Sequence, residues 1–377
     1  MVAAAVMCVA VIAIGHLRGV PFSEILMISI SQVVGMIPEG LPVAMTIALA
    51  VGVQRMARRG AVVRRLTAVE TLGSTTIICS DKTGTLTRNE MTVTAIQLPD
   101  GPEVEVTGAG YGPEGTFLED GHAIDPARAQ ALRTLLEAGV LCNDAQLRET
   151  SAAEPRWTAI GDPTEIALLT AAIKGGIAPS TLRATWPRLA EIPFDPAAKL
   201  MATQHLGPSG SRIILKGAPE PLLELCRSVR RNGQESALDD QARLHLHDTA
   251  ERMAARALRV LAIGVVEGAE LDDSAGFAAL RGQVTLLGLL GQIDPPRAEV
   301  KDAVERCRAA GIRPVMVTGD HKATGHAIAK ALGMSRDGDS TVDGRELEQM
   351  SDAELADRLD GIAVFARVHP AQKLRIV

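Results

Sequence analysis

Aromatic side chains are scarce in this sequence. Phenylalanine, tryptophan and tyrosine make up 2% of its 377 residues, so few side chains are available to stack on a ring-shaped ligand. The five cysteines are widely spaced, with no CxxC motif and no cluster of histidines beside them. This spacing argues against a disulfide framework or a zinc site and favours a reducing compartment. The cysteines are Cys8, Cys79, Cys142, Cys226 and Cys307.

An excess of positive charge is also lacking. The 39 lysines and arginines are outnumbered by 45 aspartates and glutamates, which gives a formal net charge of 39 − 45 = −6. Such a balance does not indicate nucleic acid as a partner. Any phosphate or nucleotide site must therefore be built locally. The chain is too long for one typical core, so we expect two or more domains.

Apolar residues are concentrated in two runs near the N-terminus. Residues 2–14 carry no charge, and residues 25–53 carry one, Glu39. About 20 residues cross the hydrocarbon of a bilayer, so the second run is long enough to span it and the first is too short. The first run lacks the basic region of a signal peptide. We therefore expect a membrane helix that is truncated at Met1.

The connection and the flanking charges orient this predicted hairpin. Residues 15–24 form a short loop that contains Gly19 and Pro21, and arginine is in excess between residues 55 and 65. Basic residues beside a membrane segment favour the cytoplasmic side. We expect an integral membrane protein in which the hairpin lies in the lipid bilayer and the rest of the chain lies in the cytoplasm.

Glu39 stands between Pro38 and Pro42 in the motif PEGLP. An acid at the centre of a membrane helix costs about 2.5–3.5 kcal/mol on insertion scales, so it normally faces protein or water. The two prolines remove backbone donors and leave nearby carbonyls free, and carbonyls beside a carboxylate suit a hard cation. A proline-kinked helix whose glutamate pairs with a neighbouring helix is the alternative. The predicted cation ligands are Val34, Gly35, Ile37 and Glu39.

The remainder of the chain alternates strands with helices. The predicted elements are a buried strand at 76–80, a helix at 298–310 closed by Gly311, a strand at 313–317, a helix to about residue 332 and a strand at 362–368. This alternation predicts a parallel sheet, whose ligands bind at the carboxyl ends of the strands. Asp81 and Asp320 both follow such ends. Because about 200 residues separate Asp81 from the later strands, a second domain must be inserted between them.

The first of these strands leads into CSDKTGTLTRNE, residues 79–90. A carboxylate at a strand end can attack a phosphorus atom in line, while Lys82 and backbone amides near Gly84 offset phosphate charge. An Asp-capped turn would use the same residues. The spacing alone leaves both interpretations open.

A family resemblance favours phosphoryl transfer. CSDKTGTLT resembles the phosphorylation motif of the P-type ATPases, cation pumps that pass through an aspartyl phosphate, and PEGLP resembles the fourth membrane helix of their calcium-pump branch. Further motifs occur in the family's order and cover essentially the whole chain. They are KGAPE (216–220), DPPR (294–297), VTGD (317–320) and ARVHPAQK (366–373), with weaker matches at LCND (141–144), GDPTE (161–165) and LRVLA (258–262).

The resemblance implies an α/β fold in which a membrane helix hairpin precedes a Rossmann-like phosphorylation domain of the haloacid-dehalogenase type. An α+β nucleotide-binding domain is inserted into the phosphorylation domain. The expected bounds are 1–56 for the two membrane helices, 57–90 and 293–377 for the two parts of the phosphorylation domain, and 91–292 for the insertion.

The resemblance also implies the roles of the phosphorylation residues. Asp81 would take the γ-phosphoryl group of ATP, and its carboxylate and the Thr83 carbonyl would hold Mg²⁺. Related hydrolases often carry an acid two residues after the nucleophile. Thr83 cannot act as an acid, so the acyl phosphate should persist long enough for a conformational change. The remaining predicted catalytic residues are Lys82, Thr318, Gly319, Asp320 and Lys373.

For ATP the family pattern places adenine near Phe194, Lys216 and Glu165, with Arg259 towards the phosphates. Gly217 follows Lys216 and would leave room for a ligand beside the backbone. The full set of predicted ATP-binding residues is Glu165, Phe194, Lys199, Lys216, Gly217, Arg259 and Arg367.

The resemblance predicts ATP-driven transport with calcium as the first choice of cation and manganese or a monovalent cation behind it. Two parts of a complete pump are not found in this sequence: the TGE motif of the actuator domain and the GDGxND loop, before which the chain stops. The remaining membrane helices are also missing. We therefore expect an incomplete pump that binds nucleotide without transporting alone. The alternatives are a membrane-tethered phosphotransferase of the haloacid-dehalogenase type and a noncatalytic ATP-binding remnant.

Overall fold

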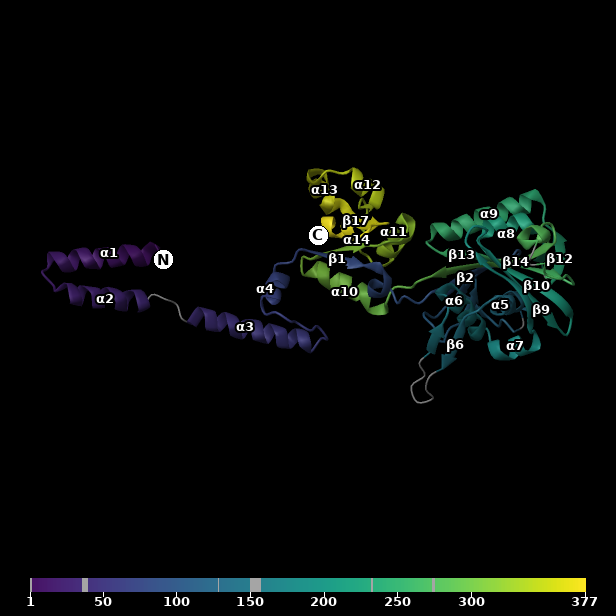
Figure 1. Ribbon diagram of the computed structural model, residues 1–377, viewed down its shortest axis with the longest axis horizontal. Coiled ribbons are helices and arrows are strands. Elements are labelled where there is room, and N and C mark those ends of the chain that lie inside the picture. The colour runs from purple at the N-terminus through teal and green to yellow at the C-terminus, as the bar shows by residue number, and fades with distance from the viewer. Residues whose placement is uncertain (1, 36–39, 128, 150–156, 232, 273–274) are drawn as a thin grey trace. The chain divides into compact units, whose positions relative to one another are not determined.

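The structure is a computed structural model that describes residues 2–35, 40–127, 129–149, 157–231, 233–272 and 275–377. The chain divides into two compact units, Met1–Thr76 and Ile77–Val377. The described part of the first unit is helical, and the second contains sheets with helices on their faces (Figure 1). The predicted mixed α/β class is confirmed.

The helices of the first unit are α1 (Val2–Leu17), α2 (Phe22–Gly35), α3 (Gly40–Ala57) and α4 (Thr67–Gly73). Helices α1 and α2 pack together as a hairpin through Gly15 and the buried Ile25. A Cβ atom at Gly15 would lie 2.7 Å from Cγ1 of Ile25, so a glycine is required where these helices approach. The connection is shorter than the predicted loop because α1 continues to Leu17 and α2 begins at Phe22.

Among the described helices, α3 is long and apolar enough to cross a membrane, and the apolar part of α1, Val6–Leu17, is shorter. The predicted second apolar run, residues 25–53, covers most of α2 and most of α3. Pro42 lies in the first turn of α3 and does not interrupt that helix, because a first-turn N–H has no helical partner to lose. Glu39, Ile37 and Pro38 lie outside the described residues.

A four-stranded parallel sheet begins the second unit. Its strand order is β1 (Ile77–Asp81), β15 (Arg313–Val317), β17 (Ile362–Ala366) and β16 (Ser340–Asp343). Strand β15 has the predicted bounds, whereas β17 ends two residues early, where Arg367 takes a φ of +51°. The prediction that β1 is buried is wrong. Among the described strands β1 pairs only with β15, and as an edge strand it leaves Ile78 36% exposed.

Helices cover both faces of this sheet. They are α10 (Ala298–Ala309), α11 (Lys322–Ala331), α12 (Gly344–Gln349), α13 (Asp352–Arg358) and α14 (Pro370–Ile376). Along β15, Met316 joins the core beneath α10 and α11, and its neighbours Val315 and Val317 join the core beneath α12, α13 and α14. A strand with two buried faces needs a continuous apolar run. This explains why residues 315–317 of β15 are all apolar and do not alternate with polar residues.

A larger sheet is formed by residues between β1 and α10. Its main path runs β5 (His122–Ile124), β4 (Phe117–Glu119), β3 (Glu103–Val106), β2 (Thr92–Gln97), β14 (Val284–Ile293), β13 (Arg259–Glu267), β10 (Gly210–Gly217), β9 (Leu200–Gly207) and β8 (Arg188–Asp195). Strand β11 (Cys226–Arg231) pairs with β14, and β12 (Gln234–Ala237) pairs with β11. A separate hairpin pairs β6 (Gln146–Glu149) with β7 (Trp157–Ile160).

This sheet also has two covered faces (Figure 1). The helices on one face are α5 (Gln130–Leu141), α6 (Pro163–Lys174) and α7 (Pro179–Thr185), and those on the other are α8 (Pro219–Leu225) and α9 (Asp240–Ala255). In β10, Ile214 packs towards α5 and α6, whereas Ile213 and Leu215 pack towards α8 and α9. The two cores hold this sheet in place as a scaffold for the residues on its edges.

His205 on β9 generates a pH-dependent contribution to stability. It is 2% exposed, and its ring nitrogens lie 3.0 Å from the Trp186 carbonyl and 2.9 Å from Thr203 Oγ1. Burial lowers the pKa of His205, and the nearby Arg188, Arg183 and Arg212 lower it further. Below the unfolded pKa of about 6.5 the unfolded chain therefore binds more protons at this residue than the folded chain.

We predict that the free energy of unfolding falls as the pH drops below about 6.5 and that His205→Gln flattens this part of the profile. Urea unfolding followed by the fluorescence of the two tryptophans, one of which is Trp186 beside His205, measures both. His122→Gln serves as the control because His122 is exposed. An unchanged slope in His205→Gln would contradict the assignment.

Candidate functional site

Asp81 is the last residue of β1 and lies at the carboxyl edge of the parallel sheet, opposite Val317 of β15. Its Oδ2 accepts a hydrogen bond of 2.5 Å from Nζ of Lys373, which lies in α14. The Asp81 and Lys373 side chains are 46% and 37% exposed, so the pair is open to a ligand. The sheet brings together these two residues, which are 292 positions apart.

Lys82 is buried at 6% exposure immediately after this carboxylate. Its ammonium group forms an ion pair with Asp320 and lies 3.9 Å from Oδ2 of Asp294. A buried charge requires such partners, since removing it from water is costly. Lys82 therefore points into the protein and links the segments that carry the two aspartates.

Asp294 was not among the predicted site residues, although it begins the DPPR motif. It directly follows β14 and is 8% exposed. Its Oδ2 accepts a 2.5 Å hydrogen bond from Thr87 Oγ1, and its Oδ1 accepts a 3.2 Å bond from the backbone of Glu90. From the same motif, Arg297 donates to the carbonyls of Gly84 and Thr87, at 3.1 Å each. The DPPR segment thus holds the turn that follows Asp81.

That turn, Lys82–Leu86, needs a glycine. Gly84 has a φ of +72°, a backbone conformation that favours glycine, and Thr83 before it is extended. Across the sheet edge, the backbone of Asp320 donates to Thr318 Oγ1 at 3.1 Å, and the buried Thr318 donates its own N–H to Phe365. The loop after β15 is therefore fixed beside the loop after β1, and Gly319 lies within it.

The donor set at this edge suits a hard divalent cation. Oxygen atoms are available from the Asp81 carboxylate, the Thr83 carbonyl and the Asp320 carboxylate, and no cysteine or histidine interrupts them in the two loops, 81–87 and 318–320. Three carboxylates and two ammonium groups lie here, counting Asp294, Lys82 and Lys373, so the net charge is 2 − 3 = −1. The residues present fit Mg²⁺.

A second candidate site is a cavity of about 550 Å³ beside the larger sheet. Six of the seven predicted ATP-binding residues line it, namely Glu165, Phe194, Lys199, Lys216, Gly217 and Arg259. Sequence reasoning did not single out Asp144, Thr164, Met201, Ala218, Val260 and Leu261, which also line it. The motifs LCND, GDPTE, KGAPE and LRVLA, quoted for the resemblance, contain most of these additional residues.

An ion pair organises one wall of this cavity. Lys216 at the end of β10 pairs with Glu165 in the first turn of α6, and its Nζ also donates to the Cys142 carbonyl at 2.7 Å. Glu165 in turn accepts a 3.1 Å hydrogen bond from the backbone of Asp144. Arg259 donates to Thr164 Oγ1 at 3.0 Å. Phe194, 56% exposed on β8, leaves its ring available for contact.

The structure gives a further reason for a glycine at position 217. A Cβ at this position would lie 2.1 Å from the carbonyl oxygen of Lys199 and 2.8 Å from Cδ2 of Leu200. A side chain at position 217 would therefore collide with the neighbouring strand, while the backbone of Gly217 lines the cavity. Lys199 itself has a φ of +55°, which marks a tight turn between β8 and β9.

Arg367 does not line the same cavity as the other predicted ATP-binding residues. It follows β17 and lines a different cavity with Asp343, Gly344, Arg345, Glu348 and His369. Its backbone donates to the Asp320 carbonyl at 2.9 Å, which links it to the loop after β15. Arg367 does not line the cavity that contains Phe194 and Lys216.

Of the predicted cation ligands, Val34 and Gly35 lie in the last turn of α2, and Val34 is 52% exposed. Ile37 and Glu39 lie outside the described residues.

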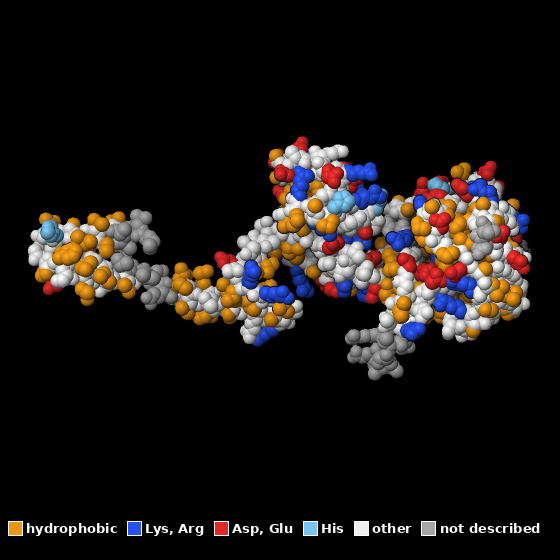
Figure 2. All heavy atoms as spheres, in the orientation of Figure 1, with side chains coloured by type: hydrophobic (Ala, Val, Ile, Leu, Met, Phe, Trp, Pro, Cys, Tyr) orange, Lys and Arg blue, Asp and Glu red, His pale blue; other side chains and the backbone are white. Residues whose placement is uncertain are grey.

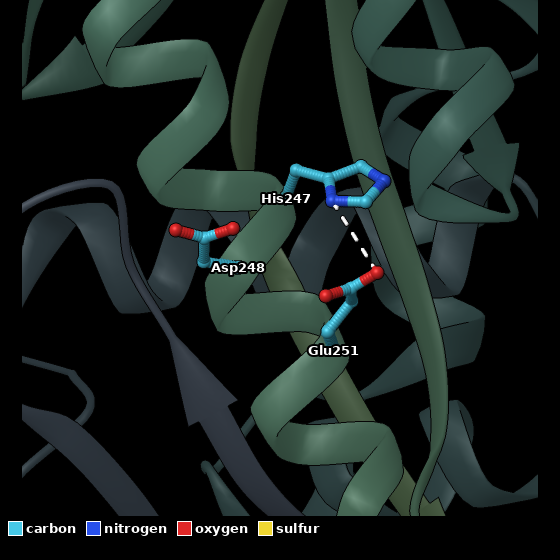
Figure 3. A group of neighbouring side chains, drawn as sticks. All are labelled: His247, Asp248 and Glu251. Carbon is cyan, nitrogen blue, oxygen red and sulfur yellow. Dashed lines mark ion pairs between the residues drawn. The ribbon is translucent and has the colours of Figure 1, made fainter.

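Figure 3 shows a third group, His247, Asp248 and Glu251 on α9, whose ligand atoms lie within 4.8 Å of one another. Nδ1 of His247 lies 3.8 Å from Oε1 of Glu251, as expected for exposed residues one helical turn apart. All three come from one helix on the surface, so we assign no metal to them.

Two family models match the chain. Residues 131–299 match the cytoplasmic domain N of P-type ATPases, and residues 225–377 match the haloacid dehalogenase-like hydrolases. The second match contains the strands β15, β16 and β17 of the parallel sheet. In this chain a domain N of the P-type ATPase kind is therefore followed by a parallel sheet of the haloacid dehalogenase-like kind.

Three relatives extend the similarity over nearly the whole chain. The chain is 43% identical over 97% of its length to the probable cation-transporting ATPase F of Mycobacterium tuberculosis. It is 38% identical over 100% of its length to the calcium-transporting ATPase of Bacillus subtilis, and 40% identical over 97% to the human calcium-transporting ATPase type 2C member 1. It spans 40%, 42% and 38% of these relatives, respectively.

The chain belongs to the P-type ATPases. Both family models match it, and the relatives named above are cation- or calcium-transporting ATPases.

Asp294 provides the sharpest test of the charge cluster. We predict that Asp294→Ala lowers the free energy of unfolding by about 3–5 kcal/mol, because it removes one of the two carboxylates near the buried Lys82 ammonium and the carboxylate that accepts from Thr87 and Glu90. Asp360→Ala is the matched control, since Asp360 is 97% exposed and should change stability by about 1 kcal/mol or less. Urea denaturation measures both values, and equal effects would contradict a structural role for Asp294.

Proposed function

We propose that this chain carries the ATP-binding and phosphorylation machinery of a membrane pump that transports a cation, with calcium as the transported ion. The observation that carries the proposal is the position of Asp81 at a parallel strand end, with Lys373 on its carboxylate and the Lys82–Asp320 pair behind it. Phosphoryl transfer depends mainly on positioning and charge stabilisation, which this arrangement supplies.

The proposed reaction begins with the Asp81 carboxylate. One of its oxygens attacks the γ-phosphorus of ATP in line, a bond forms between that oxygen and phosphorus, and the bond to the bridging oxygen breaks. ADP leaves with the bridging oxygen and its electron pair. Lys373 moves from the free carboxylate to the phosphoryl oxygens, since its ammonium group already lies 2.5 Å from Asp81. Attack by a carboxylate oxygen requires no general base, in contrast to attack by a hydroxyl group.

Mg²⁺ would be held by the Asp81 carboxylate and the Thr83 carbonyl and would neutralise phosphate charge when bound. Thr318 and Gly319 belong to the loop that faces the same edge, and their backbone would orient the phosphoryl oxygens. Thr83 carries a hydroxyl where an acid would promote hydrolysis, which favours a long-lived acyl phosphate. A long-lived acyl phosphate gives the membrane part time to change its affinity for the ion.

For nucleotide binding we propose the cavity lined by Phe194, Lys216 and Arg259. The ring of Phe194 stacks on adenine, Glu165 and Lys216 form the polar wall, and Arg259 and Lys199 supply positive charge towards the phosphates. Arg367, beside the loop of Asp320, acts at the phosphorylation end of the same reaction. The negative net charge of the chain is consistent with a phosphate site built from these few local cations.

The transported ion is proposed to bind at PEGLP, with Glu39 as the acid and the carbonyls of Val34, Gly35 and Ile37 around it. Calcium prefers such oxygen ligands. Two of the three relatives named above are called calcium-transporting, which supports the choice. The membrane location of α3 is part of the same proposal, as is a cytoplasmic position of the unit Ile77–Val377.

We predict that Phe194→Ala raises the Kd of a fluorescent ATP analogue about tenfold or more, since stacking on a base is worth about 1–3 kcal/mol. Leu189→Ala is the matched control: Leu189 lies on the same strand, is 57% exposed and does not line the cavity. Fluorescence titration measures both. Equal affinity in the two variants would argue against this adenine position.

We predict that the protein in its native membranes, given ATP labelled at the γ-phosphate, acquires acid-stable, hydroxylamine-sensitive label when calcium is present. Asp81→Asn should remove the label, and Asp337→Asn, an exposed control, should retain it. Label that depends on manganese and not on calcium would assign manganese as the transported ion. Label that is indifferent to every cation would favour the tethered phosphotransferase, and no label would favour a noncatalytic remnant.

A further inference from the structure

A dense group of positive side chains begins in the last turn of α3 and continues beyond its C-terminal end. Five arginines lie between residues 55 and 65, all of them exposed, and no acid follows until Glu70. Within the described residues none of the five has an ion-pair or side-chain hydrogen-bond partner. We call residues 55–66 the arginine loop. Its charges are Arg55, Arg58, Arg59, Arg64 and Arg65.

The arginine loop has a defined backbone. The N–H of Ala61 donates to the Met56 carbonyl at 3.0 Å, and Gly60 takes a φ of +80°, so the helix ends in a left-handed turn. The chain then returns along α3, and α4 packs against that helix. The two helices approach closely at Gly52, where a Cβ would lie 3.2 Å from Cγ1 of Val69 in α4. This packing holds the arginines together at one end of α3.

Apolar side chains are placed among these arginines. Val62 is 86% exposed and Leu66 is 47% exposed, and neither joins a hydrophobic core. Helix α3, which precedes them, buries none of its residues within its unit. Figure 2 shows basic side chains gathered at the C-terminal end of α3, beside the hydrophobic side chains along that helix. An apolar helix followed by mixed apolar and basic residues matches the change from hydrocarbon to headgroups across a bilayer leaflet.

We propose that the arginine loop binds the headgroups of anionic phospholipids. The guanidinium groups donate to lipid phosphates, for which their planar fork of donors is suited, and Val62 and Leu66 enter the boundary between headgroups and acyl chains. The occupant is lipid because the loop directly continues the one described helix that could span a membrane. Clusters of basic residues just outside such a helix attract anionic lipid. This inference rests on the proposed membrane location of α3.

The test uses the whole chain, reconstituted into vesicles of phosphatidylcholine and phosphatidylglycerol. Native mass spectrometry of the protein released from these vesicles gives the ratio of the two bound lipids. Each basic residue near an anionic surface strengthens the attraction about fivefold, so R58Q/R59Q/R64Q/R65Q should reduce the enrichment of phosphatidylglycerol about tenfold or more, and high salt should weaken it in the unaltered chain.

The control variant removes four exposed arginines from the unit Ile77–Val377, as R227Q/R281Q/R336Q/R358Q, and should keep the enrichment. Extraction of both variants with alkaline carbonate reports membrane insertion separately. Retention in the membrane without enrichment, or enrichment that survives in R58Q/R59Q/R64Q/R65Q, would overturn the lipid inference alone. Complete extraction of the unaltered chain would overturn both this inference and the membrane part of the proposed function.

Discussion

Three carboxylates lie close together at the edge of the parallel sheet, and the rest of the candidate site depends on how two lysines neutralise them. Two unit charges about 4 Å apart interact by roughly 4 kcal/mol at the effective dielectric constant near a protein surface. Lys82 offsets this repulsion for Asp320 and Asp294, and Lys373 offsets it for Asp81. Lysine pairing therefore lets three carboxylates lie close together where ligands of a parallel sheet bind.

One strand connects this charge cluster with the cavity that Phe194 and Lys216 line. Near the end of β14, Gln292 is fully buried and donates to the Thr164 carbonyl at 3.1 Å, and Thr164 lines the cavity. Two residues later Asp294 holds Thr87 in the turn that follows Asp81. The same short segment thus positions residues of both candidate sites, so a change in the direction of β14 would affect the two sites together.

Sequence reasoning was most successful where the signal is local. The strand 313–317 was predicted to the residue because a short apolar run precedes a polar strand end, and α10 was predicted because Gly311 closes it. The location of Phe194 and Lys216 in one cavity came from family resemblance. Contacts across long separations were not accessible: Asp294 meets Thr87 across 207 residues, and the carbonyl of Lys199 lies where a Cβ of residue 217 would be. The edge position of β1 likewise depends on strand order.

The central claim is that Asp81 receives the phosphoryl group, and borohydride trapping tests it most directly. The protein is phosphorylated with ATP in its native membranes, quenched and reduced with sodium borohydride, which converts an aspartyl phosphate to homoserine. Peptide mass spectrometry then locates the modified position. The account predicts homoserine at position 81 and unmodified Asp294 and Asp320. Homoserine at either of those aspartates, or phosphorylated protein with no homoserine at position 81, would contradict it.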